Sequence, residues 1–203
     1  MYTLFYEIAQ AYHSVQRDVL LRAMHRLHMT DLFINLVSDS LTGLTSCVRT
    51  AYSITRRFDV LRSLRQGCPL APILFVVLMD ALHDGLERNP FSGERAGLEL
   101  QLVRNANPVH MVSLGYADDT NVLASSLANL RILNDWVHYF MCFNALRLNH
   151  SKCKLVGRDA DGIPVTAAAV AAAGIAIEGH AIVPLDHNVP IRYLGAHCRF
   201  DGD

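Results

Sequence analysis

LGYADDTNVLA, residues 114–124, is the stretch that decides the fold, because it sets two adjacent carboxylates inside an otherwise uncharged and mostly apolar run. β-Type apolar residues on both sides, across residues 109–125, predict a hairpin with Asp118 and Asp119 at its tip. Adjacent carboxylates repel each other and are costly to desolvate unless a cation lies between them. Magnesium favours carboxylate oxygens and shares its coordination shell with substrate phosphates. The pair is therefore a candidate magnesium site, and the commoner alternative is a solvated turn.

The composition is that of a globular protein without a general affinity for polyanions. Of the 203 residues, 51% are hydrophobic and 18% are charged, and the formal net charge is −1. Such a chain can bury a core as one domain, and any nucleic-acid binding must rest on a local basic patch. One candidate patch holds five arginines and a single acid, Asp59: Arg49, Arg56, Arg57, Arg62 and Arg65. The alternative for this segment is a solvated, arginine-bearing hairpin.

Cysteine usage and the apolar runs indicate the protein's environment. Five cysteines without a C-x-x-C pair argue against a disulfide framework and a zinc knuckle, and favour a reducing compartment. The longest apolar runs, residues 68–79 and 163–177, fall short of the ~20 residues that span a bilayer. No signal peptide is recognisable at the start. We expect an intracellular protein, nuclear or cytoplasmic, without a membrane partner.

The order of the expected elements predicts the fold class. Residues 3–9 are typical of a strand. Helical spacing predicts helices at residues 15–29 and 127–143, and at residues 31–41 with Asp31 as N-cap. A further helix is expected to begin at Pro69 and Pro72 and to end near residue 89. Residues 46–65 favour a hairpin, and residues 191–198 favour a last strand. This order fits an α+β fold with an antiparallel sheet and helices packed on one face. A phosphoacceptor signalling domain is a distant alternative, since it requires a parallel sheet.

Four sequence blocks in fixed order carry a resemblance to a known family. They are RQGCPLAPILF at residues 65–75, YADD at residues 116–119, NALRLNHSKCKLV at residues 144–156 and YLG at residues 193–195. Together they resemble the palm of a reverse transcriptase of the non-LTR, LINE-like retrotransposon type. The resemblance implies an RNA-directed DNA polymerase that adds deoxynucleoside triphosphates to a DNA primer 3′-OH on an RNA template. It also implies two-metal phosphoryl transfer with two Mg²⁺ ions, or Mn²⁺ in their place.

The resemblance also implies roles for residues outside the acid pair. Gln66 and Gly67 match the family's Gln-Gly, which lies against the incoming nucleotide and the template. Lys152 matches a lysine thought to protonate or steady the pyrophosphate leaving group, and its alternative is an exposed loop lysine. Tyr12 matches an aromatic that stacks beneath the nucleotide sugar and excludes a 2′-hydroxyl. The turn of the YLG block resembles the primer grip and consists of Tyr193, Leu194 and Gly195.

Two departures from the family pattern put catalysis in question. Glu7 stands where the family has its third metal-binding aspartate, and His13 stands where a second aspartate is common. The extra methylene of a glutamate moves the oxygens by about 1 Å, whereas catalytic geometry tolerates roughly 0.5 Å. We expect a palm core at residues 1–157 and connecting, primer-grip-like strands at residues 158–203. Fingers and thumb are absent from this expectation and would belong to a longer parent protein.

The departures leave an alternative function open. It is a catalytically inactive, truncated retroelement remnant that keeps the palm fold and binds nucleic acid or protein. Under the preferred hypothesis, Glu7, Asp118 and Asp119 form one metal site.

Overall fold

The computed structural model describes residues 1–65, 67–88, 96–101, 107–186, 189–193 and 196–198. The helices of this part of the chain are α1 (Ala11–Ser14), α2 (Arg17–Arg26), α3 (Asp31–Leu41), α4 (Ala71–Arg88), α5 (Leu127–Phe143) and α6 (Ala167–Ala172). The strands are β1 (Tyr2–Glu7), β2 (Thr45–Ser46), β3 (Phe58–Asp59), β4 (Leu98–Leu100), β5 (Val109–Met111), β6 (Ser113–Tyr116), β7 (Asp119–Ala124), β8 (Lys154–Gly157), β9 (Ala176–Ile177), β10 (His180–Ala181), β11 (Ile191–Tyr193) and β12 (Ala196–Cys198).

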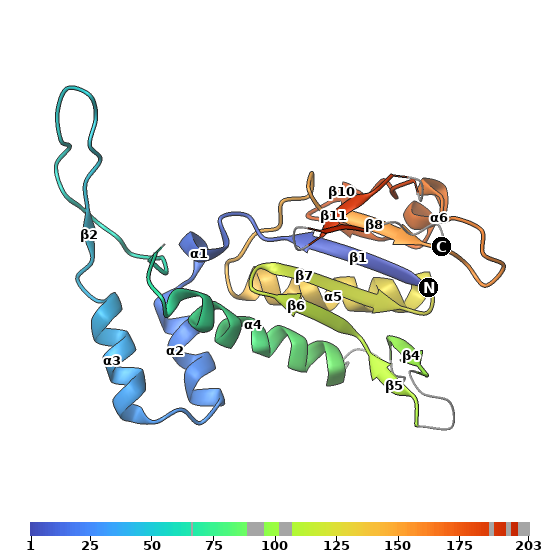
Figure 1. Cartoon of the computed structure of the whole chain (residues 1–203), viewed down its shortest axis with the longest axis horizontal. Helices are drawn as coiled ribbons and strands as arrows, with labels where there is room; N and C mark the ends of the chain where they lie inside the picture. The colour runs from blue at the N-terminus through green and yellow to red at the C-terminus, as the bar shows by residue number, and fades with distance from the viewer. Residues whose placement is uncertain (66, 89–95, 102–106, 187–188, 194–195, 199–203) are drawn as a thin grey trace.

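The central sheet has four antiparallel strands in the order β6-β7-β1-β8 (Figure 1). β6 and β7 are the two strands of the expected acid-bearing hairpin. In the register of β1 and β7, Tyr6 lies opposite Thr120 and Glu7 lies opposite Asp119. The antiparallel pairing confirms the α+β expectation and contradicts the parallel sheet that a phosphoacceptor domain requires.

Two helices cover one face of this sheet. α4 packs against β6, while α5 packs against β7 and β1 and lies behind the strands in Figure 1. Residues of one parity along β1 enter the core: Leu4 and Tyr6 are buried, and the Tyr6 hydroxyl donates to Asn134 Oδ1 of α5 at 3.0 Å. Side chains of a strand alternate between faces, so Phe5 and Glu7 point to the opposite face. The helices therefore leave the acid-bearing face uncovered at the Glu7 end.

A second helical layer and a projecting hairpin complete the described part. α2 packs against α4, and α3 packs against α2. After α3 the chain runs out into the arm, which we define as residues 45–59 and which includes β2 and β3. The arm stands clear of the body at the upper left of Figure 1. None of the helices described here is long and apolar enough to cross a bilayer.

Several expected boundaries hold, and others are wrong. α5 covers the expected residues 127–143, because Ser126 Oγ caps it by accepting from Asn129 N at 3.1 Å. The expected helix at residues 15–29 is shorter, and α1 precedes it. Asp31 is not the N-cap of α3: Thr30 holds that position and Asp31 begins the helix. The expected single strand at residues 191–198 is instead the antiparallel pair β11 and β12.

Candidate active site at the acid-bearing hairpin

Glu7 and Asp119 lie side by side on the uncovered face of the sheet. They are directly opposed in the β1–β7 register, which brings together residues 112 positions apart in the chain. Their strand parity is opposite to that of the buried Leu4 and Tyr6, so both carboxylates leave the core on the same face. The structure thus brings Glu7 next to the acid pair, as the resemblance predicts.

The tip of the hairpin holds Asp118 in a tight turn. Tyr116 pairs with Asp119 in the β6–β7 register, and only Ala117 and Asp118 connect the strands. Ala117 adopts a left-handed backbone with φ of 54°, a conformation that costs free energy for a residue with a Cβ. Such strain is typical of functional turns, and here it fixes the direction in which Asp118 leaves the sheet.

The three carboxylates interact electrostatically. Burial, then Asp118 and then Glu7 raise the pKa of Asp119 above its ordinary value. Each cause disfavours the ionised form of Asp119. A hard divalent cation would reverse the effect of the two neighbouring charges, and carboxylate oxygens are the ligands that Mg²⁺ prefers. By the chemistry of the donor set, these residues fit Mg²⁺ or Mn²⁺.

Lys152 lies over the same carboxylates. Its Nζ is 2.7 Å from Glu7 Oε1. The turn that carries it is fixed to the end of β1, because Asn149 N donates to the Glu7 carbonyl at 2.8 Å and Lys152 N donates to the Asn149 carbonyl at 2.9 Å. The hydrogen bond with Glu7, the charge of Glu7 and the charge of Asp118 all raise the pKa of Lys152.

The ion pair with Lys152 bears on the expected metal site. Within the described residues, no three acid, histidine or cysteine side chains come close enough together to hold an ion. Whether Glu7, Asp118 and Asp119 hold an ion together therefore stays a prediction. In this arrangement the Glu7 carboxylate is paired with Lys152.

Tyr12 lies near the acids and is hydrogen-bonded to the segment before α4. Tyr12 lies in α1, its ring centroid is 5.1 Å from that of Phe75, and its carbonyl accepts from Leu64 N at 2.7 Å. Burial, Asp118 and Tyr116 raise the pKa of Tyr12, which indicates that its hydroxyl lies in the field of the acidic tip. Gly67 has φ of 85° and open space where a Cβ would lie. The other residue of this block, Gln66, lies outside the described residues.

The remaining expected site residues lie in two places. Arg49, Arg56 and Arg57 are on the arm, and Arg62 and Arg65 follow on the segment that returns to the body. Tyr193 ends β11, whereas Leu194 and Gly195 lie outside the described residues. The role of the primer-grip-like turn therefore stays a prediction.

His83 is a neighbour of the hairpin that the sequence analysis missed. Its Nδ1 is 2.8 Å from Ser113 Oγ of β6, and a Cβ added at Gly115 would lie 2.4 Å from its Nε2. Burial lowers the pKa of His83, against the opposing charges of Asp80 and Glu87. The available signal was Gly115 itself, since a glycine within a strand marks a close approach of another group.

Comparison with known proteins gives a family and several relatives. A family model described as reverse transcriptase (RNA-dependent DNA polymerase) matches residues 1–198. The Retrovirus-related Pol polyprotein from type-1 retrotransposable element R2 of Popillia japonica is 28% identical over 157 residues, which cover 77% of this chain. The Pol polyprotein from type-2 retrotransposable element R2DM of Drosophila melanogaster is 25% identical over 151 residues, or 74% of this chain. The matched stretches span only 21% and 13% of the two polyproteins.

Solved structures with a similar fold come from telomerase. Apo telomerase from Candida tropicalis, truncated from its C-terminal domain, matches with a TM-score of 0.52 and 14% identity, over 75% of this chain and 30% of that one. Candida tropicalis telomerase in complex with the TWJ fragment of telomeric RNA matches with a TM-score of 0.55 and 13% identity, over 79% and 26% of the two chains. These likenesses confirm the fold.

Proposed function

Since the chain belongs to the reverse transcriptase (RNA-dependent DNA polymerase) family, we propose that it is the palm of an RNA-directed DNA polymerase of a non-LTR retrotransposon. It would add deoxynucleotides to the 3′-OH of a DNA primer on an RNA template. The observation that carries the proposal is the register that opposes Glu7 and Asp119 beside the Asp118 turn. The stretches that match this chain make up 21% and 13% of the two polyprotein relatives.

In the proposed mechanism, the acids hold metal and the neighbours position substrate. Two Mg²⁺ or Mn²⁺ ions held by Glu7, Asp118 and Asp119 would activate the attacking oxygen and stabilise the leaving group. Tyr12 would support the nucleotide sugar, and the open space at Gly67 would admit the nascent base pair. Positioning and charge neutralisation supply most of the rate in this class of reaction.

Lys152 has two proposed states. In the described arrangement it neutralises Glu7, and its raised pKa keeps it protonated at neutral pH. A cation at Glu7 would replace Lys152 there and leave the ammonium available to protonate the pyrophosphate leaving group. If no cation is bound, the Lys152–Glu7 ion pair would keep the Glu7 carboxylate occupied.

The second candidate is an inactive remnant with a binding role. The observation that favours it is Glu7, whose longer side chain is engaged by Lys152 at 2.7 Å. Misplacement of a reacting group by about 1 Å can cost on the order of 10²-fold in rate. The two candidates differ in whether the chain can support any metal-dependent extension.

A single-turnover primer-extension assay separates the two. The chain, supplied with fingers and thumb from a related polymerase, is given an RNA template, a DNA primer and Mg²⁺. We expect extension that Asp118→Asn and Asp119→Asn each reduce by at least about 100-fold, and that Glu7→Asp increases. Extension that persists in Asp118→Asn would contradict the two-metal proposal. Absence of extension in both the unchanged protein and Glu7→Asp would favour the remnant.

A further inference from the structure

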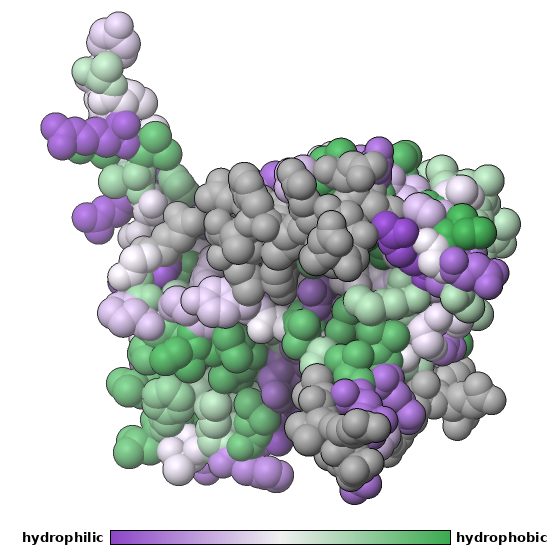
Figure 2. Space-filling view, turned by 45° about the vertical axis from the view of Figure 1, so that its right-hand side comes forward, coloured by the Kyte–Doolittle hydropathy of each residue, from purple (hydrophilic) through white to green (hydrophobic). Residues whose placement is uncertain are grey.

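The arm exposes apolar side chains that a free hairpin has no reason to carry. Tyr52 at its turn is 98% exposed, and Val48, Ile54 and Phe58 along its stem are also exposed. In Figure 2 the arm projects from the body with hydrophobic and hydrophilic residues interspersed along it. An isolated two-stranded hairpin is marginally stable in water. The arm therefore has the properties of a binding surface whose exposed apolar side chains a ligand would cover.

The charges of the arm identify the chemistry of that ligand. Arg49, Arg56 and Arg57 form no ion pair with any residue in the described ranges. Four arginines of the body, by contrast, are each paired with an aspartate: Arg22, Arg26, Arg88 and Arg131. Since Asp59 is the only acid in the arm, the positive charge of the arm is uncompensated. A polyanion complements such a surface.

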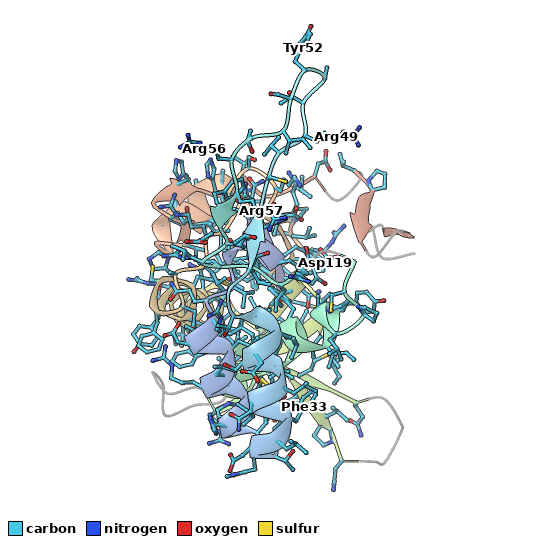
Figure 3. The ribbon with its side chains drawn as sticks, turned by 90° about the vertical axis from the view of Figure 1, so that its left-hand side faces the viewer. Phe33, Arg49, Tyr52, Arg56, Arg57 and Asp119 are labelled. Carbon is cyan, nitrogen blue, oxygen red and sulfur yellow. The ribbon has the colours of Figure 1, made fainter. Side chains whose placement is uncertain are left out.

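The strand register of the arm spreads the arginines around its stem. Ser46 pairs with Phe58 and Arg49 bridges to Ile54. The first strand advances three residues between these two pairs, whereas the second advances four. This extra residue, a β-bulge on the side that carries Arg56 and Arg57, redirects the side chains that follow it. In Figure 3, Arg49 and Arg56 lie on opposite sides of the stem and Tyr52 lies at its far end. Guanidinium groups on both sides suit a phosphate chain that follows the stem and passes over the aromatic tip.

We propose that the arm is a binding site for an unpaired stretch of nucleic acid, with Tyr52 stacking on a base and the three arm arginines contacting phosphates. Stacking on an exposed aromatic ring requires a base with a free face, which a duplex offers only at its ends. The stem is joined to the candidate active site, since Leu64 N, just after the arm, bonds the Tyr12 carbonyl at 2.7 Å. The inference rests on the proposed polymerase function and adds that the arm holds the single-stranded template outside the site.

The test is equilibrium binding by the chain itself, without chemistry. Fluorescence anisotropy is measured with a labelled single strand of about ten nucleotides, as RNA and as DNA, and with a blunt duplex of the same length. We expect Tyr52→Ala to weaken single-strand binding about tenfold and to leave duplex binding unchanged, because one base stack is lost. Tyr52→Phe keeps the ring and should bind as the unchanged chain does. RNA and DNA should respond alike, because every base has a π-face.

Two matched variants control for general effects. Phe143→Ala removes another exposed aromatic, 67% exposed at the end of α5, and Arg22→Ala removes an exposed arginine already paired with Asp18. Neither should alter single-strand binding. The inference is overturned if Tyr52→Ala binds as tightly as the unchanged chain, if duplex binding weakens equally, or if the chain binds no single strand and the arm instead serves a protein partner. Because the assay involves no catalysis, each of these results is distinct from a failure of primer extension.

Discussion

At the scale of single residues, Asp119 lies in the candidate active site, and its ionised carboxylate lowers the free energy of unfolding. Burial, Asp118 and Glu7 raise its pKa, so the folded chain binds this proton more tightly than the unfolded chain does. The free energy of unfolding therefore falls as the pH rises from the ordinary value of 3.8 through the raised pKa. Above that range the ionised Asp119 destabilises the fold by its full amount.

Removing this charge should stabilise the protein at neutral pH. Like charges directly opposed on a sheet cost roughly 0.2–1 kcal/mol, so Asp119→Asn should raise the melting temperature by about 1–3 °C at pH 7 in the presence of a chelator. The gain should shrink as the pH is lowered toward the ordinary pKa, where the native carboxyl is protonated. Circular dichroism melts across this pH series provide the measurement. A lower melting temperature for the variant at pH 7, or a gain independent of pH, would contradict the interpretation.

At the scale of elements, the acid hairpin is fitted against α4 through a glycine. The backbone of β6 at Gly115 lies against the imidazole of His83, and Ser113 on the same strand bonds that imidazole. The position of the hairpin, and with it the direction of Asp118, therefore depends on a helix that begins 44 residues before Gly115.

A side chain at Gly115 should separate β6 from α4. The Cβ of Gly115→Ala would lie 2.4 Å from His83 Nε2, so the variant should lose about 1–3 kcal/mol of stability in urea unfolding. His83→Ala removes the obstructing ring. The double variant should therefore lose less than the sum of the two single losses, because neighbouring changes are coupled. Additive losses would show that the two groups do not press on each other.

Sequence patterns predicted the elements well where the signal is local. Residues 127–143 were predictable as α5 because helical spacing and the Ser126 cap lie within one segment. The opposed position of Glu7 followed only from the family resemblance, and the ion pair of Lys152 with Glu7 joins residues 145 positions apart that no local pattern connects. Alternation predicted a hairpin between residues 46 and 65, but it could not tell that the strands are two residues each and that their residues are exposed.

At the scale of the whole molecule, charge is distributed unevenly between arm and body. The net charge of −1 provides no overall attraction for a polyanion, and five arginines without an ion pair to any described residue lie in or just after the arm: Arg49, Arg56, Arg57, Arg62 and Arg65. Binding of nucleic acid must therefore be local. Its strength should depend on the few counterions that these arginines displace.

The salt dependence of binding should report those contacts. Replacing Arg56 and Arg57 together by alanine should weaken binding of a single strand and reduce the slope of log affinity against log salt by about 1.4, roughly 0.7 for each phosphate contact. Arg131→Ala, which removes an arginine paired with Asp135 on α5, should leave the slope unchanged. A slope that survives the double replacement would assign the phosphate contacts to another part of the molecule.

Because of the way it is attached, the arm should unfold more easily than the body of the protein. Few backbone bonds hold the arm, among them Thr50 N to Ser53 O at 2.8 Å and Thr55 N to Val48 O at 3.0 Å, and the residues of its two strands are exposed. Local opening of such a segment requires much less free energy than global unfolding. In hydrogen exchange, the amides of the arm should equilibrate with solvent while those of β1, enclosed by β7 and β8, remain protected. The chain thus has a labile extension on a stable body, and an extension that opens and closes freely can fit strands of different sequence.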